Sequence, residues 1–509
     1  MYGRGVILYI MAYGILGTYA VRAQDTLTSV TMKERVGTER SLFVQRVDRH
    51  YNSPALKRFL RNWNVSSMDA GHRYEAHDLF IYQQGSGYRQ VGVNAQSLRH
   101  TSKGTLWGEA QYQNKRTFGI NYSESMDYDV IAPYVMADTV GGALQTERYA
   151  FRGGYAWQRG RWDYGAEAGF RGDQGYRNRD PRLNAVVADI DATLAAAIAL
   201  TSRYQLATHL GGSRYRQVNH LSFVNEVGQP LVYHDAGFGV YNTLLAGTRS
   251  EAYYTGYTWA PAIYLVPHDR QGWFANVSYR VFFLHKELEN ILDPIAKIKA
   301  RTWAGNAGYA SVWGNRRFYA GVSGQVQLRD GYEARFNNRD VETGMHKIDE
   351  SLRYIDDNRS MALDAAFEHD GPSMRWAIAG TGGYARNRMS YVAPERRMEI
   401  GYLQGGMRLS ATKSWSTFWL TAQLGYSHRA PTSRISEWTD VSSHRGIYQM
   451  LDGNFAYLAS GQRRWQAALQ TDVQVSPVLV GFLNINGQLT RYDGRQQGSL
   501  LSVNVGFLF

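Results

Sequence analysis

The stretch WFANVSYRVFFL, residues 273–284, alternates apolar and polar side chains along most of its length. One face carries Trp273, Ala275, Val277, Tyr279, Val281 and Phe283, and the other carries Asn276, Ser278 and Arg280. Successive side chains of a β-strand point to opposite sides of the sheet, so this spacing predicts a strand. Aromatic residues end the apolar face, where a lipid-facing strand meets the two membrane interfaces. The stretch therefore predicts a membrane-spanning strand of a β-barrel.

The same alternation recurs from about residue 80 onward, for example in WDYGAEAGF (162–170) and FWLTAQLGY (418–426). Short and long connections alternate between these segments. The short ones include QNKR (113–116), QRGR (158–161) and GNR (314–316), and the long ones span 127–145, 220–251, 329–356 and 431–457. Outer-membrane barrels show this asymmetry, with short periplasmic turns and long outer loops.

These patterns predict an all-β fold, a transmembrane antiparallel β-barrel of about 18 strands, with 16 or 20 as alternatives. The first three predicted strands are 80–99, 104–113 and 117–127. Met450–Ala459 also resembles a strand. Counting it would leave the last strand pointing outward, so we assign it to an outer loop. A barrel of this width leaves an aqueous lumen unless something fills it.

The N-terminal part of the chain differs from the rest. Residues 1–23 have the basic, apolar and small-residue pattern of a cleaved signal peptide. Residues 24–78 are expected to form a short periplasmic or plug segment, because residues 41–63 show helical spacing around Pro54 and no β alternation. Residues 79–509 are then the barrel.

Composition narrows the class of protein. The chain has 509 residues, no Cys and a formal net charge of +12. Beyond the signal peptide no apolar run reaches the ~18 residues of a membrane-spanning helix, which excludes a helical membrane protein. The absence of Cys excludes disulfides, thiol catalysis and a lipoprotein anchor. The charges are scattered, which favours contact with anionic lipid headgroups over nucleic-acid binding.

Motifs for catalysis or cofactor binding are missing. The sequence contains neither G-x-S-x-G nor HExxH, so we expect no enzyme and no cofactor, although a barrel-embedded enzyme stays an alternative. His72 and His77 would lie on opposite faces of a strand, which argues against a shared metal ion. The acid-rich segment Asp340–Asn358 is better explained as a solvated outer loop than as a cation site.

Six charged residues are expected to point into the lumen: Asp163, Glu167, Arg171, Asp189, Asp191 and Arg280. Two interpretations stay open for them. They could line a pore and set its selectivity, or they could pair between strands and close the lumen.

The last residues, LSVNVGFLF (501–509), continue the alternation, with Phe507 and Phe509 expected in the periplasm-side aromatic girdle. Together with Gly506, they resemble the C-terminal signal read by the barrel-assembly machinery. That machinery and outer-membrane lipid are therefore expected partners.

Four stretches carry a resemblance to a known family: AVRAQD (20–25), YNSPALKRF (51–59), GTLWGEAQYQNKRTFGINYSE (104–124) and VNVGFLF (503–509). They resemble a family of large outer-membrane β-barrels from Bacteroidota whose function is unknown. The resemblance implies a location in the cell outer membrane and an accessory role beside a TonB-dependent receptor or a surface lipoprotein. We therefore expect an accessory component of an outer-membrane transport or assembly complex, with an autonomous porin-like diffusion channel as the alternative.

Overall fold

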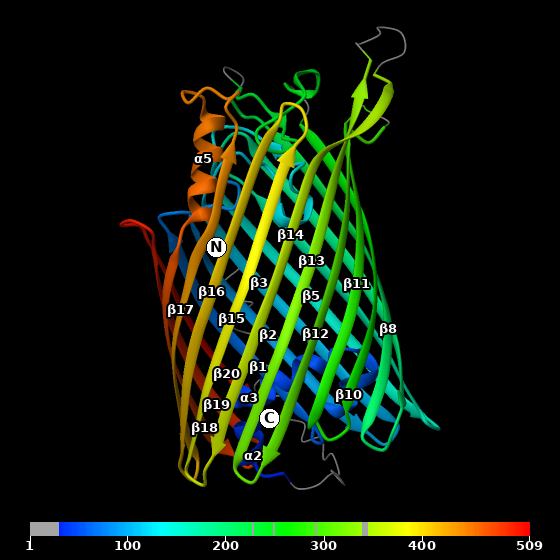
Figure 1. The fold of residues 1–509 in the computed structure, drawn as a ribbon, viewed down its shortest axis with the longest axis vertical. Helices are drawn as coiled ribbons and strands as arrows, with labels where there is room; N and C mark the ends of the chain where they lie inside the picture. The colour runs from blue at the N-terminus through cyan, green and yellow to red at the C-terminus, as the bar shows by residue number, and fades with distance from the viewer. Residues whose placement is uncertain (1–29, 226–228, 248–249, 290, 292, 338–344) are drawn as a thin grey trace.

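The computed structural model describes residues 30–509 except 226–228, 248–249, 290, 292 and 338–344. The predicted signal peptide, residues 1–23, lies outside the described residues. Eighteen strands form one antiparallel sheet, and the pairing of β1 with β20 closes it into a barrel (Figure 1). The barrel strands are β1 (Val65–His77), β2 (Gly87–Thr101), β3 (Gly104–Ile120), β5 (Gly142–Arg159), β6 (Trp162–Tyr176), β7 (Arg182–Ala199), β8 (Tyr204–Ser222), β10 (Glu251–Pro267), β11 (Gly272–Leu288), β12 (Ala296–Trp313), β13 (Arg316–Phe336), β14 (Lys347–Asp370), β15 (Met374–Tyr391), β16 (Arg396–Ser414), β17 (Phe418–Glu437), β18 (Gln462–Ser476), β19 (Leu479–Tyr492) and β20 (Gln497–Leu508).

The outer face of the barrel is apolar. In β11, Trp273 and Val277 are exposed while Phe274 and Leu284 are buried on the inner side, as the alternation predicts. Exposed Leu, Ile and Val side chains recur on nearly every strand. So large an apolar surface is stable only when hydrocarbon covers it. Among the described residues, no helix has the length and apolar character needed to cross a membrane.

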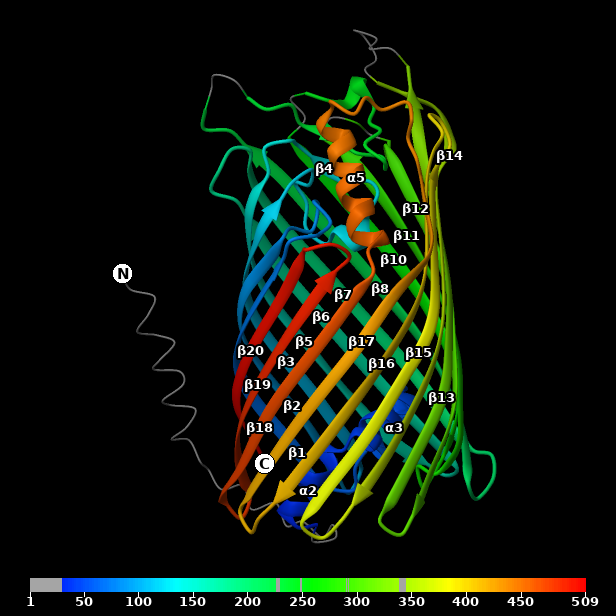
Figure 2. The same ribbon diagram turned by 60° about the vertical axis from the view of Figure 1, so that its left-hand side comes forward.

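The two ends of the barrel differ. At one end, which we call the short-turn end, hairpins close through connections as short as residues 160–161 and 314–315. At the opposite, long-loop end, the connections include residues 121–141, 223–250 and 438–461 (Figures 1 and 2). The predicted asymmetry between a short-turn end and a long-loop end is confirmed, although the connections 177–181 and 392–395 at the long-loop end are short.

The predicted number of strands is confirmed, but two predicted details are wrong. Residues 65–77, assigned to the periplasmic or plug segment, form β1, so the barrel begins before the predicted boundary at residue 79. Residues 104–120 form one strand, β3, whereas the tetrad QNKR (113–116) was interpreted as a turn. β1 escapes detection because Gly, Ala, Ser and charged residues fill much of it. QNKR was mistaken for a turn because the inner side chains of this part of β3 are polar, as the lumen is. The predicted number of strands is still correct, because one strand was missed and another was counted as two.

The segment 450–459 does not cross the membrane, as the parity of the strands requires. It belongs to a helix, α5 (Gly446–Ala459), in the long loop between β17 and β18. Helical structure was not predicted there. In Figure 2, α5 stands against the barrel wall at the long-loop end. The hairpin of β13 and β14 rises above the rim at the upper right of Figure 1, away from α5, and residues 347–358 of the acid-rich segment belong to β14.

Residues 30–64, which we call the plug segment, occupy the lumen at the short-turn end (Figure 1). Their elements are α2 (Met32–Arg40), α3 (Leu42–Asp48), η1 (Arg49–Tyr51) and η2 (Pro54–Phe59). A capping box between Thr31 and Glu34 starts α2. Ser41 ends α2 and caps α3 by accepting a hydrogen bond from the Val44 amide. The prediction of a non-β N-terminal segment is therefore confirmed for this range.

Candidate functional site

The plug segment packs through an apolar face onto the inner wall of the barrel. Val47, Ala55 and Leu56 are fully buried there. The wall opposite them is built largely of alanines: Ala195, Ala197, Ala207, Ala262, Ala310, Ala366, Ala377 and Ala379. Small inward side chains leave the space that the helices fill. Gly165 of β6 extends this fit, because a Cβ there would lie 2.7 Å from the carbonyl oxygen of Pro54.

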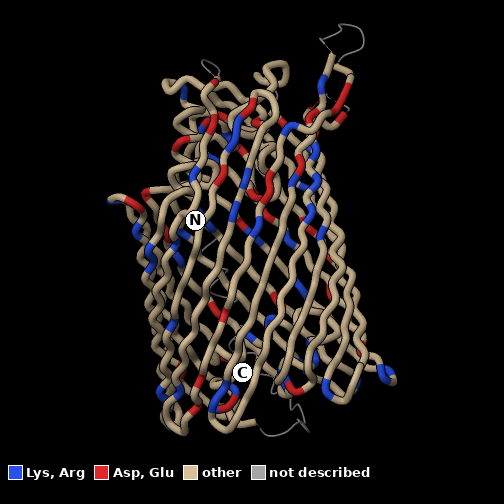
Figure 3. Tube along the Cα trace, viewed as in Figure 1, with Lys and Arg blue, Asp and Glu red and all other residues tan. Residues whose placement is uncertain are grey.

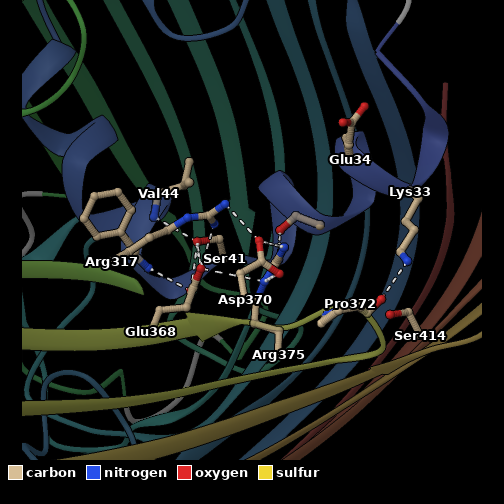
Figure 4. Close-up of polar contacts among 12 residues, drawn as sticks. Lys33, Glu34, Ser41, Val44, Arg317, Glu368, Asp370, Pro372, Arg375 and Ser414 are labelled. Carbon is tan, nitrogen blue, oxygen red and sulfur yellow. Dashed lines mark hydrogen bonds and ion pairs between the residues drawn. The ribbon is translucent and has the colours of Figure 1, made fainter. Parts of the chain in front are cut away.

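A buried carboxylate ties the plug segment to β14 (Figure 4). The side chain of Glu368 is 1% exposed and accepts a 2.7 Å hydrogen bond from the Ser41 hydroxyl. It also forms an ion pair with Arg317, whose Nη1 lies 2.9 Å from Oε1 of Glu368. Nearby, Arg375 binds Asp370 at 2.8 Å and donates to the carbonyl oxygen of Gly37. Glu368 therefore joins the α2–α3 junction to the wall through charge-assisted hydrogen bonds.

Further arginines of the plug segment reach wall carboxylates around the barrel. Arg40 binds the fully buried Asp472 of β18 at 2.7 Å. Arg46 binds Asp364 of β14 at 3.1 Å. Arg58 pairs with Asp163 of β6. Because these carboxylates lie on separate parts of the wall, the plug segment is held from several sides rather than hinged at one point.

His50 lies at the centre of this packing. Its ring stacks on Phe274 at 4.7 Å, and Nε2 lies 2.9 Å from the Tyr319 hydroxyl. Burial lowers the pKa of His50 to about 4, so the docked plug segment carries a neutral imidazole at neutral pH.

We expect acid to loosen the plug segment. A free histidine has a pKa of about 6.5, so between about pH 6.5 and pH 4 the undocked state binds more protons and docking weakens as the pH falls. A spin label on Gln45→Cys, unique because the chain has no Cys, should become more mobile between about pH 7.5 and pH 5. His50→Gln should remove this dependence, and replacing the exposed His444 by Gln should preserve it. Unchanged mobility across the range would contradict the expectation.

The long-loop end is closed by a second apolar core, which we call the outer-loop core. Ile131, Val135 and Met136 of the loop after β3 are fully buried. They pack with Tyr254, Leu284 and other inward side chains of the wall. A short sheet of β4 (Met136–Ala137) and β9 (Tyr233–His234) joins this loop to the loop after β8. The loops therefore fold into the barrel mouth.

Inward cations of the wall hold the backbone of the outer-loop core. Lys286 of β11 donates to the carbonyl oxygen of Val135 at 3.0 Å, and Arg329 of β13 donates to that of Ala132 at 2.7 Å. Arg429 of β17 binds the carbonyl oxygens of Tyr457 and Leu458 at the end of α5, each at 3.2 Å. Loop carbonyls taken away from water need such donors.

A buried ion pair completes this closure. Glu124 in the loop after β3 pairs with Arg177 just beyond β6, and the two side chains are 0% and 1% exposed. Arg177 also donates to the carbonyl oxygen of Ser123 at 3.0 Å. This pair fixes the first turn of the loop against the barrel rim.

The six charged residues predicted to point inward all do so, and five of them pair. Arg152 of β5 binds Glu167 and Asp191 at 2.8 Å each. Arg171 binds Asp127 at 2.7 Å and Asp189 at 3.5 Å. Asp163 holds the plug segment, as described above. Arg280 forms no ion pair within the described part of the chain. Inter-strand pairing thus describes most of the set, and Figure 3 shows both signs of charge interspersed along the strands.

Sequence reasoning missed the residues that close the lumen. The acidic wall residues Glu368 and Asp472 and the cations Lys286 and Arg329 meet their partners only in the folded barrel. The one available indication was a charged residue at an inward position of a strand. Within the described residues, no cluster of three or more His, Asp or Glu side chains is placed to hold a metal ion.

The residues of the predicted assembly signal lie at the seam between β20 and β1. Phe507 and Phe509 are exposed on the outer face, as expected for a girdle. Gly506 points inward. A Cβ on Gly506 would lie 2.7 Å from the Phe482 ring and 2.8 Å from Cβ of Asp69, and closer still to the carbonyl oxygen of Met68. The seam therefore has no room for a side chain at this position.

A closed barrel with an apolar outer face and a lumen filled at both ends defines a plugged transmembrane β-barrel. The chain belongs to a family of unknown function, DUF6850, whose model matches residues 54–509. No curated protein sequence matches the chain significantly.

Solved structures that match most of the chain include a receptor, a transporter and the protein OpdK. A mutant of the ferric enterobactin receptor PfeA from Pseudomonas aeruginosa shares 7% identity, with 87% of this chain and 80% of the receptor covered and a TM-score of 0.36. The copper transporter OprC shares 8% identity, with 87% and 80% covered and a TM-score of 0.40. OpdK from Pseudomonas aeruginosa, crystallised with vanillate, shares 9% identity, with 88% and 98% covered and a TM-score of 0.33.

Proposed function

We propose that the protein is an outer-membrane barrel that acts, with its lumen closed, as an accessory component of an outer-membrane transport or assembly complex. The observation that carries the proposal is the double closure of the lumen. Apolar packing of the plug segment fills part of the lumen at the short-turn end, and a separate apolar core of folded-in loops fills part of it at the long-loop end. Two such cores would obstruct the passage of solutes through a free-standing diffusion channel.

The proposed orientation of the barrel in the membrane follows from the lengths of its connections. Short turns lie in the periplasm in barrels of this class, and long loops lie outside. The plug segment then closes the periplasmic end, and the outer-loop core with α5 faces the exterior. In this setting a TonB-dependent receptor or a surface lipoprotein is the proposed partner, and the barrel-assembly machinery is the proposed route of insertion through Gly506, Phe507 and Phe509.

One observation favours the alternative, a porin-like channel. A polar cavity of about 770 Å³ lies between the plug segment and the wall, lined by Arg49, Asp69, Asn94 and Glu109 among others. It would conduct only if the plug segment and the outer loops moved aside. Two buried cores would have to open together for that, so we rank the channel second.

The accessory role is tested by isolating the tagged full-length protein from native outer membranes in mild detergent. We expect a discrete complex in which a second envelope protein is present at fixed stoichiometry. A monomer in every mild detergent, with no envelope protein crosslinked in intact cells, would contradict the accessory role and leave the closed lumen unaffected.

A further inference from the structure

The outer face of the barrel has an apolar cavity of about 620 Å³ over β17, β18, β19 and β20 (Figure 2). Its walls are mainly exposed apolar side chains, among them Leu424, Tyr426, Trp465, Leu489 and Leu501. Ala467 and Gly487 lie directly opposite each other at its floor, and a Cβ at Gly487 would have no atom within 4 Å. Small-molecule sites usually measure roughly 300–1,000 Å³, so the cavity can take an acyl chain.

Aromatic side chains mark the membrane interface at the long-loop side of this cavity. The rings of Tyr426 and Trp465 lie 5.7 Å apart, and such residues favour the boundary between hydrocarbon and headgroups. The next outward residue of β18 toward the long-loop end is Arg463, and that of β19 after Leu489 is Arg491. The Arg491 guanidinium lies 5.6 Å from the centre of the Trp465 ring. Both arginines therefore lie at headgroup level beside the cavity.

Arg463 and Arg491 are paired directly opposite each other in the register of β18 and β19. Both are exposed, and within the described part of the chain neither side chain forms a hydrogen bond or an ion pair. Like charges directly opposite each other destabilise a sheet. An anion held between the two guanidinium groups would relieve this repulsion.

The carboxylates at the ends of β19 and β1 do not balance the arginines of this rim. Asp493 pairs with Arg434 at 2.7 Å, and the Gly461 amide, Arg434 and Arg463 together lower the pKa of its carboxyl group. Asp78 accepts a 2.7 Å hydrogen bond from the Gln497 amide. Four arginines stand against these two carboxylates: Arg434, Arg463, Arg491 and Arg495. The local excess of charge is positive.

We infer that the cavity and the two opposed arginines form a binding site for a lipid that carries a phosphate group. The phosphate lies between Arg463 and Arg491, and an acyl chain fills the cavity. Arginine binds phosphate through short, charge-assisted and often paired hydrogen bonds. Under the proposed orientation this lipid belongs to the outer leaflet. The inference requires a membrane-spanning barrel but not the accessory role.

Native mass spectrometry of the full-length protein in detergent tests this site, with dioleoyl phosphatidic acid, dioleoylglycerol and inorganic phosphate as probes. We expect phosphatidic acid to bind at least about tenfold more tightly than either other probe, because it alone combines acyl chains with a phosphate group. No binding of phosphatidic acid, equal binding of dioleoylglycerol, or equal binding of inorganic phosphate would each overturn the inference.

Variants locate the site. The double variant Arg463→Gln, Arg491→Gln should weaken the binding of phosphatidic acid at least about tenfold. Ala467→Phe, which fills the cavity, should weaken it at least about threefold. Arg214→Gln is the matched control, because Arg214 is also exposed but belongs to β8, on the opposite side of the barrel.

Heat-modifiable gel migration verifies that each of these barrels is folded. Unchanged affinity in the folded double variant or in folded Ala467→Phe would overturn the site. An equal loss of affinity in Arg214→Gln would do the same. None of these outcomes would affect the closed lumen, which depends on inward-facing residues.

Discussion

Glu368→Gln is expected to release the plug segment from the barrel wall. The substitution keeps the size of the side chain but removes the charge that Ser41 and Arg317 share. Losing the charge of a buried hydrogen-bond acceptor costs about 1.5–3 kcal/mol, and Arg317 keeps Asp370 as an ion-pair partner at 2.9 Å, so the loss falls mainly on the bonds that hold Ser41. Trypsin should then cleave faster at the Lys and Arg residues of the plug segment than it does in the unaltered protein. The cleavage rate in folded barrels, followed by mass spectrometry, measures the effect.

The matched control for this variant is Glu437→Gln at the long-loop end of β17. Glu437 is exposed and forms no ion pair within the described residues. Its substitution should leave the cleavage rate unchanged. Equal protection in Glu368→Gln and the unaltered protein would show that the carboxylate does not anchor the plug segment.

Gly506→Ala is expected to impair closure of the barrel. The added methyl group meets the Met68 backbone and the Phe482 ring at the seam. Overpacking of this kind typically costs about 1–3 kcal/mol, and here it falls on the strand pair that closes the sheet. The Phe482 ring also supports Arg40 of the plug segment, whose guanidinium lies 5.1 Å from the ring centre. We expect a reduced yield of heat-modifiable barrel and a looser plug segment.

Gly487→Ala provides the matched control, because a Cβ at Gly487 of β19 would have no atom within 4 Å. It should fold with normal yield. If both glycine variants folded equally well, the steric account of the seam would be wrong. If Gly506→Ala lost yield only in cells and refolded normally in vitro, the residue would act through the assembly machinery instead.

The sequence was informative about the barrel wall because lipid enforces a period of two on each strand. Trp273, Val277 and Leu424 lie where the alternation places them. The same rule failed for β1 and for the centre of β3, where the inner face is polar enough to obscure the alternation. Lys115 is the clearest case: the polarity that made QNKR look like a turn is the polarity of a lumen cavity.

The closure of the lumen could not be predicted in the same way. Ser41 and Glu368 are 327 positions apart in the chain and meet only because the barrel brings β14 around the plug segment. Helical spacing in residues 41–63 indicated a plug but not its docking surface. The outer-loop core depends on Lys286, Arg329 and Arg429, whose inward direction was predictable but whose carbonyl partners were not.

The most direct test of the central claim, that the lumen is closed at both ends, is the conductance of the unaltered full-length protein in a planar lipid bilayer. The account predicts insertion without stable conductance steps of porin size, even at moderate voltage and high salt. Glu368→Gln should also stay largely closed, because the outer-loop core is intact. A large, steady open-pore current from the unaltered protein would contradict the account and establish the diffusion channel instead.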